Sequence, residues 1–147
     1  MKLTRFTDYS LRVLIYLGLQ HDERVTIREI SGAYGVSRNH LMKVVSKLTN
    51  LEYVAAQRGP GGGLALARPA AEINLADVIS DMEEDLNLVE CFCPQGQCVI
   101  TPACKLRKVL KQALQAYISC LQAYTLQDLI QGGPGLKSLL GIEQKAA

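Results

Sequence analysis

The segment TIREISGAYGVSRNHLMKVVSKL, residues 26–48, decides the fold of this chain. Thr26 and Glu29 have the spacing of a capping box, in which both side chains accept hydrogen bonds from free backbone N–H groups at a helix start. A helix is therefore expected over residues 27–34, and the glycine that follows is a common helix terminator. Ser37 can cap a second helix, whose apolar face recurs at helical spacing in Leu41, Val44, Val45 and Leu48. Two helices joined by so short a link predict a helix-turn-helix.

A glycine-rich hairpin is expected directly after these two helices. Two short strand-like runs, residues 53–58 and 64–66, flank the turn Gly-Pro-Gly-Gly-Gly at residues 59–63. This pattern predicts a β-hairpin, which in this position is the wing of a winged helix. The turn leads into a strand and lacks the Gly-Lys-Ser/Thr ending of a phosphate-binding loop, so nucleotide binding is not expected.

Further helices are expected on both sides of this unit. The pattern over residues 6–19 predicts a helix before it, and Asn74 can cap a short helix after it. The acidic run at residues 81–85 is expected to be the solvated end of that short helix.

A long helix is expected over residues 102–124. Thr101-Pro102 is a strong start, because proline suits the first helical position. An apolar seam with alternating spacings of three and four follows it, as in a coiled coil: Ala103, Leu106, Leu110, Ala113, Tyr117, Cys120 and Tyr124. Such a helix is about 33 Å long, too long for so small a domain to cover, so a homodimer is expected to form through it. One short helix is expected at residues 125–130, and the glycines after it predict a flexible tail.

Charge is unevenly distributed, although the net charge is only +2. Residues 1–68 carry ten Lys and Arg against five Asp and Glu, and residues 69–147 carry six against nine. The basic part suits the phosphate backbone of nucleic acid. No apolar run approaches the ~18 residues that span a bilayer, and the N-terminus lacks a secretory signal, so a cytoplasmic protein is expected. No grouping of His, Asp and a nucleophile suggests catalysis, so an enzyme is not expected.

The second helix of the helix-turn-helix is expected to enter the major groove of double-stranded DNA. Arg pairs with guanine edges and Asn with adenine edges, so Arg38 and Asn39 can select a base sequence. The lysines of this face are expected to contact phosphates, and the wing tip is expected to enter a minor groove. The expected contacts are Ser37, Arg38, Asn39, His40, Lys43 and Lys47 on the helix, with Arg58 and Gly59 on the wing. The alternative is that this is an ordinary solvated helix face with no DNA contact. The wing beside the helix-turn-helix makes this alternative less favoured.

The expected fold is mainly α-helical with a small β-hairpin wing, a winged helix-turn-helix plus a long dimerisation helix. The expected divisions are a DNA-binding domain at residues 1–72, a short helix with a cysteine-rich loop at 73–101, the dimerisation helix with the short helix after it at 102–131, and a flexible tail at 132–147.

Four of the five cysteines lie within fourteen residues: Cys91, Cys93, Cys98 and Cys104. Clustered thiols in a reducing compartment favour a soft-metal site over disulfides. Cys104 is expected in the first turn of the long helix, where the helix dipole favours a thiolate and other anions. The spacing alone leaves an iron–sulfur cluster and zinc both open. The fifth cysteine, Cys120, is expected to be a buried structural thiol of the seam.

Four segments together carry a resemblance to a known family. They are LTRFTDY (3–9), YGVSRNHLMK (34–43), RGPGGGLAL (58–66) and C-x6-C-V-I-T-P-A-C-K-L (91–106). They resemble the NsrR repressors, nitric-oxide sensors of the winged-helix family that also holds the iron–sulfur regulator IscR. The resemblance covers roughly residues 1–130. It implies a homodimer on an inverted-repeat operator, which leaves the DNA when nitric oxide attacks its iron–sulfur cluster.

The resemblance also implies a ligand set. By motif, the three cysteine ligands correspond to Cys91, Cys98 and Cys104, and Cys93 competes with Cys91 for the first position. The aspartate of the F-T-D-Y motif, here Asp8, can complete the cluster from the partner subunit. Its alternative role is that of a first-turn carboxylate favoured by the helix dipole. An all-cysteine set with Cys93 stays open, as do 4Fe–4S and 2Fe–2S clusters.

Two other functions remain open at this point. The first is a regulator of the same fold that senses iron–sulfur supply, redox state or zinc. The second is a small electron-transfer protein, which would have no need of a recognition helix and a wing.

Overall fold

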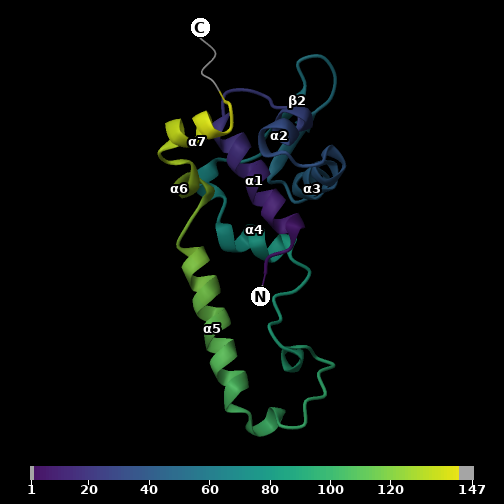
Figure 1. The fold of residues 1–147 in the computed structure, drawn as a ribbon, viewed down its shortest axis with the longest axis vertical. Coiled ribbons are helices and arrows are strands. Elements are labelled where there is room, and N and C mark those ends of the chain that lie inside the picture. Colours follow the sequence, from purple (N-terminus) through teal and green to yellow (C-terminus); the bar gives the residue numbers. More distant parts are fainter. Residues whose placement is uncertain (1, 143–147) are drawn as a thin grey trace.

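The structure is a computed structural model that describes residues 2–142. The first elements are α1 (Arg5–Leu19), α2 (Ile27–Tyr34), α3 (Arg38–Asn50), β1 (Val54–Gln57) and β2 (Gly63–Leu66). A 3-10 turn (Ala70–Glu72) leads to α4 (Leu75–Met82). Two further 3-10 turns (Glu90–Phe92 and Thr101–Ala103) lie in the cysteine loop, before α5 (Lys105–Gln122), α6 (Leu126–Ile130) and α7 (Gly133–Leu139). Figure 1 shows α5 and the cysteine loop projecting together from the body that the other elements form.

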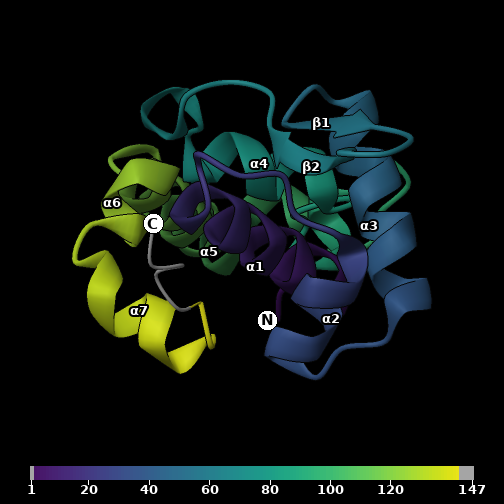
Figure 2. The ribbon, with the colours of Figure 1, turned by 90° about the horizontal axis from the view of Figure 1, so that it is seen from above.

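Helix α1 is the centre of that body. Val13, Leu14 and Leu17 recur at helical spacing and are at most 1% exposed. Helices α3, α4 and α6 and strand β2 all pack against α1. Any side chain larger than hydrogen at Gly18 would crowd Ile130, so this glycine lets α6 lie close to α1. Seen along the long axis, α2, α3 and the hairpin lie on one side of α1, and α6 and α7 on the other (Figure 2).

The helix-turn-helix forms as the sequence predicts. The Thr26 hydroxyl accepts the Glu29 N–H at 3.2 Å, and the Glu29 carboxylate accepts the Thr26 N–H at 2.7 Å, which confirms the capping box. Gly35 ends α2 with φ 65°, a left-handed conformation that favours glycine. The Ser31 hydroxyl then donates to the Val36 carbonyl at 2.6 Å and closes the turn.

The wing is an antiparallel hairpin that is held to the helices at its base. Its register runs from Val54 opposite Leu66 to Gln57 opposite Gly63. Leu64 also exchanges two backbone hydrogen bonds with Val25, just before α2. The prediction of a small β-hairpin after the helix-turn-helix is therefore confirmed, and the wing is tied to the start of α2.

Helix α5 departs from the sequence expectation in two ways. It begins at Lys105 instead of residue 102, because Thr101, Pro102 and Ala103 form a separate 3-10 turn and Cys104 becomes the N-cap. No residue of α5 is buried in the single chain, and Leu106 and Val109 are 62% and 57% exposed. Cys120 is exposed too, so the expected burial of this thiol is not found within one chain. Neither α5 nor any other helix within residues 2–142 has the length and apolar character to cross a membrane.

The segment expected as a flexible tail contains a helix. Helix α7 covers Gly133–Leu139, with Pro134 in its first turn, where the ring does not interrupt a helical hydrogen bond. Leu136 and Leu140 pack against the core, and Ile142 is buried. Apolar anchoring therefore overrides the glycine signal up to residue 142. The rest of the expected tail, residues 143–147, lies outside the described residues.

Candidate functional site: nucleic-acid interface and cysteine loop

Helix α3 presents a basic polar face to solvent. Leu41, Val44 and Leu48 turn into the core, at most 2% exposed. The opposite side exposes Arg38, Asn39, His40, Met42, Lys43 and Ser46. The Ser37 hydroxyl makes no capping hydrogen bond, although Ser37 is the N-cap. The α3 sequence contains no acidic residue, so this face can approach a polyanion without charge repulsion.

Two of the expected DNA contacts have partners within the chain. The His40 ring lies against the Tyr9 ring of α1, with centroids 6.3 Å apart. The Lys47 ammonium donates to the Met82 carbonyl at the end of α4, at 3.2 Å, and lies 5.6 Å from the centroid of the Phe6 ring. Lys47 therefore joins α3 to α4 and α1 within the single chain.

Lys47 belongs to a polar junction of α1, α3 and α4, made by Thr4, Lys47, Met82 and Glu83. The Glu83 carboxylate accepts the backbone N–H of Thr4 at 2.8 Å and its hydroxyl at 3.0 Å. Burial raises the pKa of Glu83, but the hydrogen bonds from Thr7 and Thr4 and the charge of Lys47 outweigh it and leave that pKa lowered. The acidic run was expected to be solvated, and the sequence gives no signal for this long-range contact.

The same run holds a second anchor. The Tyr53 hydroxyl donates to the Asp81 carboxylate at 2.6 Å. Burial, together with this hydrogen bond and the charge of Asp81, raises the pKa of Tyr53. The start of the hairpin is thereby fixed to α4.

The wing tip is shaped by its glycines and leaves Arg58 exposed. Gly59 has φ 89°, a conformation that L side chains rarely adopt. A Cβ at Gly62 would overlap the carbonyl oxygen of Gln57, so the turn is too tight for a larger residue. The tip can therefore hold Arg58 toward a groove, as the sequence predicts.

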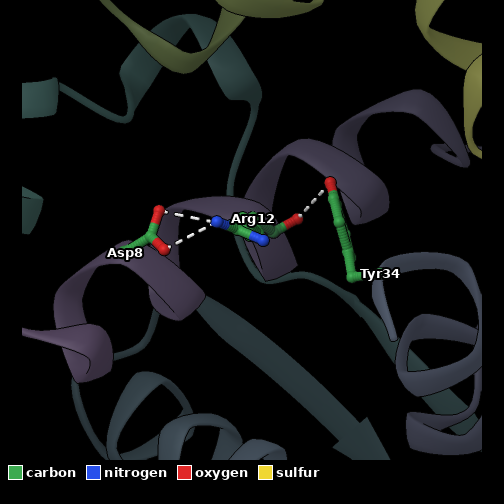
Figure 3. A network of polar contacts seen from close by, with 3 residues as sticks. All are labelled: Asp8, Arg12 and Tyr34. Carbon is green, nitrogen blue, oxygen red and sulfur yellow. Dashed lines mark hydrogen bonds and ion pairs between the residues drawn. The ribbon is translucent and has the colours of Figure 1, made fainter. Parts of the chain in front are cut away.

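Asp8 lies in the first turn of α1, with Arg12 as its partner (Figure 3). The guanidinium meets both carboxylate oxygens, at 2.8 Å and 3.2 Å. The Tyr34 hydroxyl donates to the Arg12 carbonyl at 3.0 Å, so α2 is attached to α1 one turn after Asp8. Burial raises the pKa of Tyr34 to about 12, although the charge of Arg12 lowers it. Arg12 also lies 5.6 Å from the centroid of the Tyr9 ring. The four-residue spacing between Asp8 and Arg12 is the sequence signal for this ion pair.

The cysteine loop meets α5 through Cys104 and Cys91. The Cys104 sulfur accepts the Arg107 backbone N–H at 3.4 Å and so caps the helix. The Arg107 side chain donates from Nε to the Cys91 carbonyl at 3.3 Å, which brings both ends of the loop to this helix start. A Cβ at Gly96 would overlap the Glu90 carbonyl oxygen, so the loop closes tightly next to Cys91. Neither Arg107 nor Gly96 was singled out from the sequence.

The remaining thiols are less closely placed. Cys98 is exposed and Cys93 is partly exposed. Within residues 2–142, no three His, Cys, Asp or Glu side chains are grouped closely enough to hold a metal ion. The expected ligands thus share one loop and one helix start without converging in the single chain.

One buried polar atom bears on whether a cluster fits here. The Thr101 hydroxyl oxygen is buried and, among the described residues, has no hydrogen-bond partner. Thr101 lies between Cys98 and Cys104 in the sequence, and its backbone N–H donates to the Cys98 carbonyl at 3.2 Å. A thiolate or sulfide acceptor beside it would satisfy this hydroxyl. Soft donors, a helix N-terminus and an unpaired hydroxyl are together suited to an iron–sulfur group.

Comparison with known proteins gives the family. A model of the Rrf2 family, described as an iron-dependent transcriptional regulator, matches residues 3–132. The chain is 46% identical over 142 residues to the HTH-type transcriptional regulator NsrR of Geobacillus kaustophilus, covering 95% of this chain and 97% of that protein. It is 44% identical over 146 residues to the NsrR of Bacillus subtilis, covering 98% and 100%.

Solved structures agree on the fold. The structure of CymR, the global cysteine regulator of B. subtilis, matches with a TM-score of 0.74 and 26% identity, covering 89% of this chain and 97% of that one. The IscR of T. potens matches with a TM-score of 0.73 and 20% identity, covering 93% and 91%. The curated relatives are transcriptional regulators, which confirms the predictions of a winged-helix DNA-binding regulator and of a protein that is not an enzyme. The chain belongs to the Rrf2 family of transcriptional regulators, and within that family it is similar to the NsrR proteins.

Proposed function

We propose that the chain is a cytoplasmic repressor that binds an inverted-repeat operator as a homodimer and releases it when nitric oxide attacks its iron–sulfur cluster. The observation that carries the proposal is the shared helix start of α5. The two ends of the cysteine loop meet there, through the Cys104 cap and the bond from Arg107 to Cys91. The exposed apolar face of the same helix is suited to a second copy of the chain.

The proposed ligands are Cys91, Cys98 and Cys104, with Asp8 from the partner subunit. Bound in this way, the cluster would supply iron that reacts with nitric oxide. The chain holds the thiolates at a helix N-terminus, which favours negative charge, and offers the Thr101 hydroxyl as a hydrogen-bond donor. Cys98 is exposed, so the loop can turn its thiol toward the other two when the group binds.

The proposed DNA contacts are Ser37, Arg38, Asn39, His40 and Lys43 on α3, with Arg58 and Gly59 on the wing. A dimer with two-fold symmetry places two such surfaces on two half-sites, which predicts an inverted-repeat operator. Arg38 and Asn39 are proposed to contact bases, and Lys43 to contact a phosphate. We propose no DNA contact for Lys47, since it is bonded to α4.

The contacts around Asp8 suggest how the two sites communicate. Asp8 pairs with Arg12 in the single chain, and Arg12 lies against Tyr9, whose ring contacts His40 on α3. If Asp8 ligates the partner's cluster, it can no longer hold Arg12 in the same way. A 100-fold change in DNA affinity needs a coupling free energy of only about 2.7 kcal/mol.

The proposal is tested with protein purified without oxygen. Brown protein that contains iron and sulfide, and that binds promoter DNA, is the expected result. Nitric oxide should bleach the cluster bands and abolish DNA binding over the same range of added gas. A titration in which the bands disappear while the operator affinity stays constant would overturn the sensing mechanism.

Cysteine variants assign the ligands. Cys91→Ser, Cys98→Ser and Cys104→Ser should each yield protein without a stable cluster. Cys120→Ser is the matched control, since this residue lies near the far end of α5 and should leave the cluster in place. Cys93→Ser decides the upstream position: if it loses the cluster while Cys91→Ser keeps it, Cys93 is the ligand.

The alternative is a regulator of the same fold that senses iron–sulfur supply, redox state or zinc. The description of the family model as iron-dependent and the fold shared with an IscR favour this reading over other classes. Colourless protein with bound zinc would support zinc sensing. A cluster whose presence or redox state controls DNA binding, with no response to nitric oxide, would support the other two.

A further inference from the structure

Met42 is an apolar side chain in an unusual place. It is 56% exposed, and between Thr4 and Cys98, all of which the structure describes, it is the one large hydrophobic side chain that is exposed. The other exposed large hydrophobics lie at Leu3, in the cysteine loop, on and just after α5, and at the end of α7. Met42 therefore lies apart from the proposed dimer surface.

The position of Met42 on α3 places it among the proposed DNA contacts. It follows Arg38 by four residues and Asn39 by three, so the three side chains share one face of the helix. Its neighbours Leu41 and Val44 are at most 2% exposed, so the core is already filled on the other side of the helix. Substitution of Met42 therefore removes no packing from the core.

The charge around Met42 argues against a protein partner of ordinary composition. Arg38 and Lys43 flank it, and the α3 sequence contains no acidic residue. Such a surface suits a polyanion, and the apolar group that the major groove of DNA offers is the C5-methyl of thymine. The methionine side chain is flexible and unbranched, so it can adapt its shape to a methyl group that the DNA holds in place.

We propose that Met42 contacts a thymine methyl group in each operator half-site and thereby selects an A·T pair next to the pairs that Arg38 and Asn39 recognise. This inference rests on the proposed role of α3 as the recognition helix. It adds an apolar base contact to a set that the sequence analysis limited to polar and charged residues.

The expected size of the effect follows from the group that is buried. One methyl or methylene group contributes about 0.8 kcal/mol when it leaves water, which is roughly a fourfold change in affinity. Loss of the contact in both half-sites of a dimer should therefore weaken binding about 15-fold.

The experiment removes the methyl group from the DNA and the side chain from the protein. An operator is first selected from random DNA with the wild-type protein, and each of its thymines is replaced in turn by deoxyuridine, which lacks only the methyl group. At one position in each half-site, the replacement should weaken binding by wild type about fourfold. Met42→Ala should bind the thymine operator more weakly and should show no further loss with deoxyuridine at that position.

Arg38→Ala is the matched control. It should bind more weakly, yet still lose affinity with deoxyuridine at the same position, because Met42 is intact. If wild type tolerates deoxyuridine at every position, or if Met42→Ala still loses affinity at the sensitive one, the Met42 contact is overturned. If Arg38→Ala and Asn39→Ala bind as tightly as wild type, it is the role of α3 that fails.

Discussion

Replacing Lys47 and Lys43 separately should divide the two roles that lysines have on α3. Lys47 donates to the Met82 carbonyl at 3.2 Å and lies over the Phe6 ring, whereas Lys43 is exposed and has no partner among the described residues. Lys47→Ala should therefore lower the free energy of unfolding and leave phosphate contacts unchanged. Lys43→Ala should leave the free energy of unfolding unchanged and remove a phosphate contact.

The magnitude for Lys47 comes from its contacts. A hydrogen bond from a charged donor contributes about 1.5–3 kcal/mol, and partial exposure of Lys47 reduces that range. With the added attraction of the Phe6 ring, we expect a loss of about 1–2 kcal/mol, which lowers the melting temperature by roughly 3–6 °C.

The assay pairs urea unfolding with DNA binding at several salt concentrations, with all proteins in the same metal-loading state. Each phosphate contact contributes about 0.9 to the slope of log affinity against log salt. Lys43→Ala, which removes two contacts from a dimer, should therefore reduce the slope by roughly 1.8, and Lys47→Ala should leave it unchanged. A stable Lys47→Ala variant with a reduced slope would refute the assignment of Lys47 to the α1–α3–α4 junction.

Three more predictions concern single groups. Glu83 has a lowered pKa, so its contribution to the free energy of unfolding is present above pH 4.5, the usual pKa of a glutamate, and is lost as the pH falls through the pKa of the folded state. Glu83→Gln should therefore be less stable than wild type at pH 7, and the difference in unfolding free energy, measured with urea, should shrink toward pH 3. Thr101→Val removes a buried hydroxyl without a partner, so the metal-free protein should be equally or more stable, whereas the loaded protein should have a cluster with a lower reduction potential. Thr101→Ser should keep the wild-type stability and the wild-type reduction potential. An unchanged reduction potential in Thr101→Val would contradict a hydrogen bond from Thr101 to the cluster. Asp8→Ala removes a half-exposed ion pair, so it should change the unfolding free energy of the metal-free protein by less than about 1 kcal/mol. It should nevertheless alter the response of the cluster-loaded protein to nitric oxide. If the loaded variant keeps the wild-type spectrum, cluster stability and response, Asp8 is only a first-turn carboxylate.

Local signals predict the DNA-binding half of the fold well. The capping box at Thr26, the terminator Gly35 and the glycine-rich turn all act over a few residues, so they can be recognised in the sequence alone. The buried face of α3 follows from helical periodicity in the same way.

The failures arise where contacts between distant residues decide. The acidic run at residues 81–85 has the pattern of a solvated helix end, but Glu83 lies within reach of Thr4 and is bonded to it. The glycines before α7 suggest an irregular tail, but Leu136 and Leu140 find apolar partners on the core. The Thr101-Pro102 signal marks a helical turn, and Cys104 restarts the helix three residues later because its sulfur serves as the cap.

The lack of any fully buried side chain on α5 has a consequence for the order in which a newly made chain matures. A helix of 18 residues without buried side chains is only marginally stable in water. A solitary chain would therefore unwind the first turn of α5 much of the time, and with it the Cys104 cap and the Arg107 bond that hold the loop ends together. Association of two chains would stop this fraying, so uptake of iron would follow pairing. At low copy number, the fraction of chains able to sense anything would then rise in proportion to the subunit concentration.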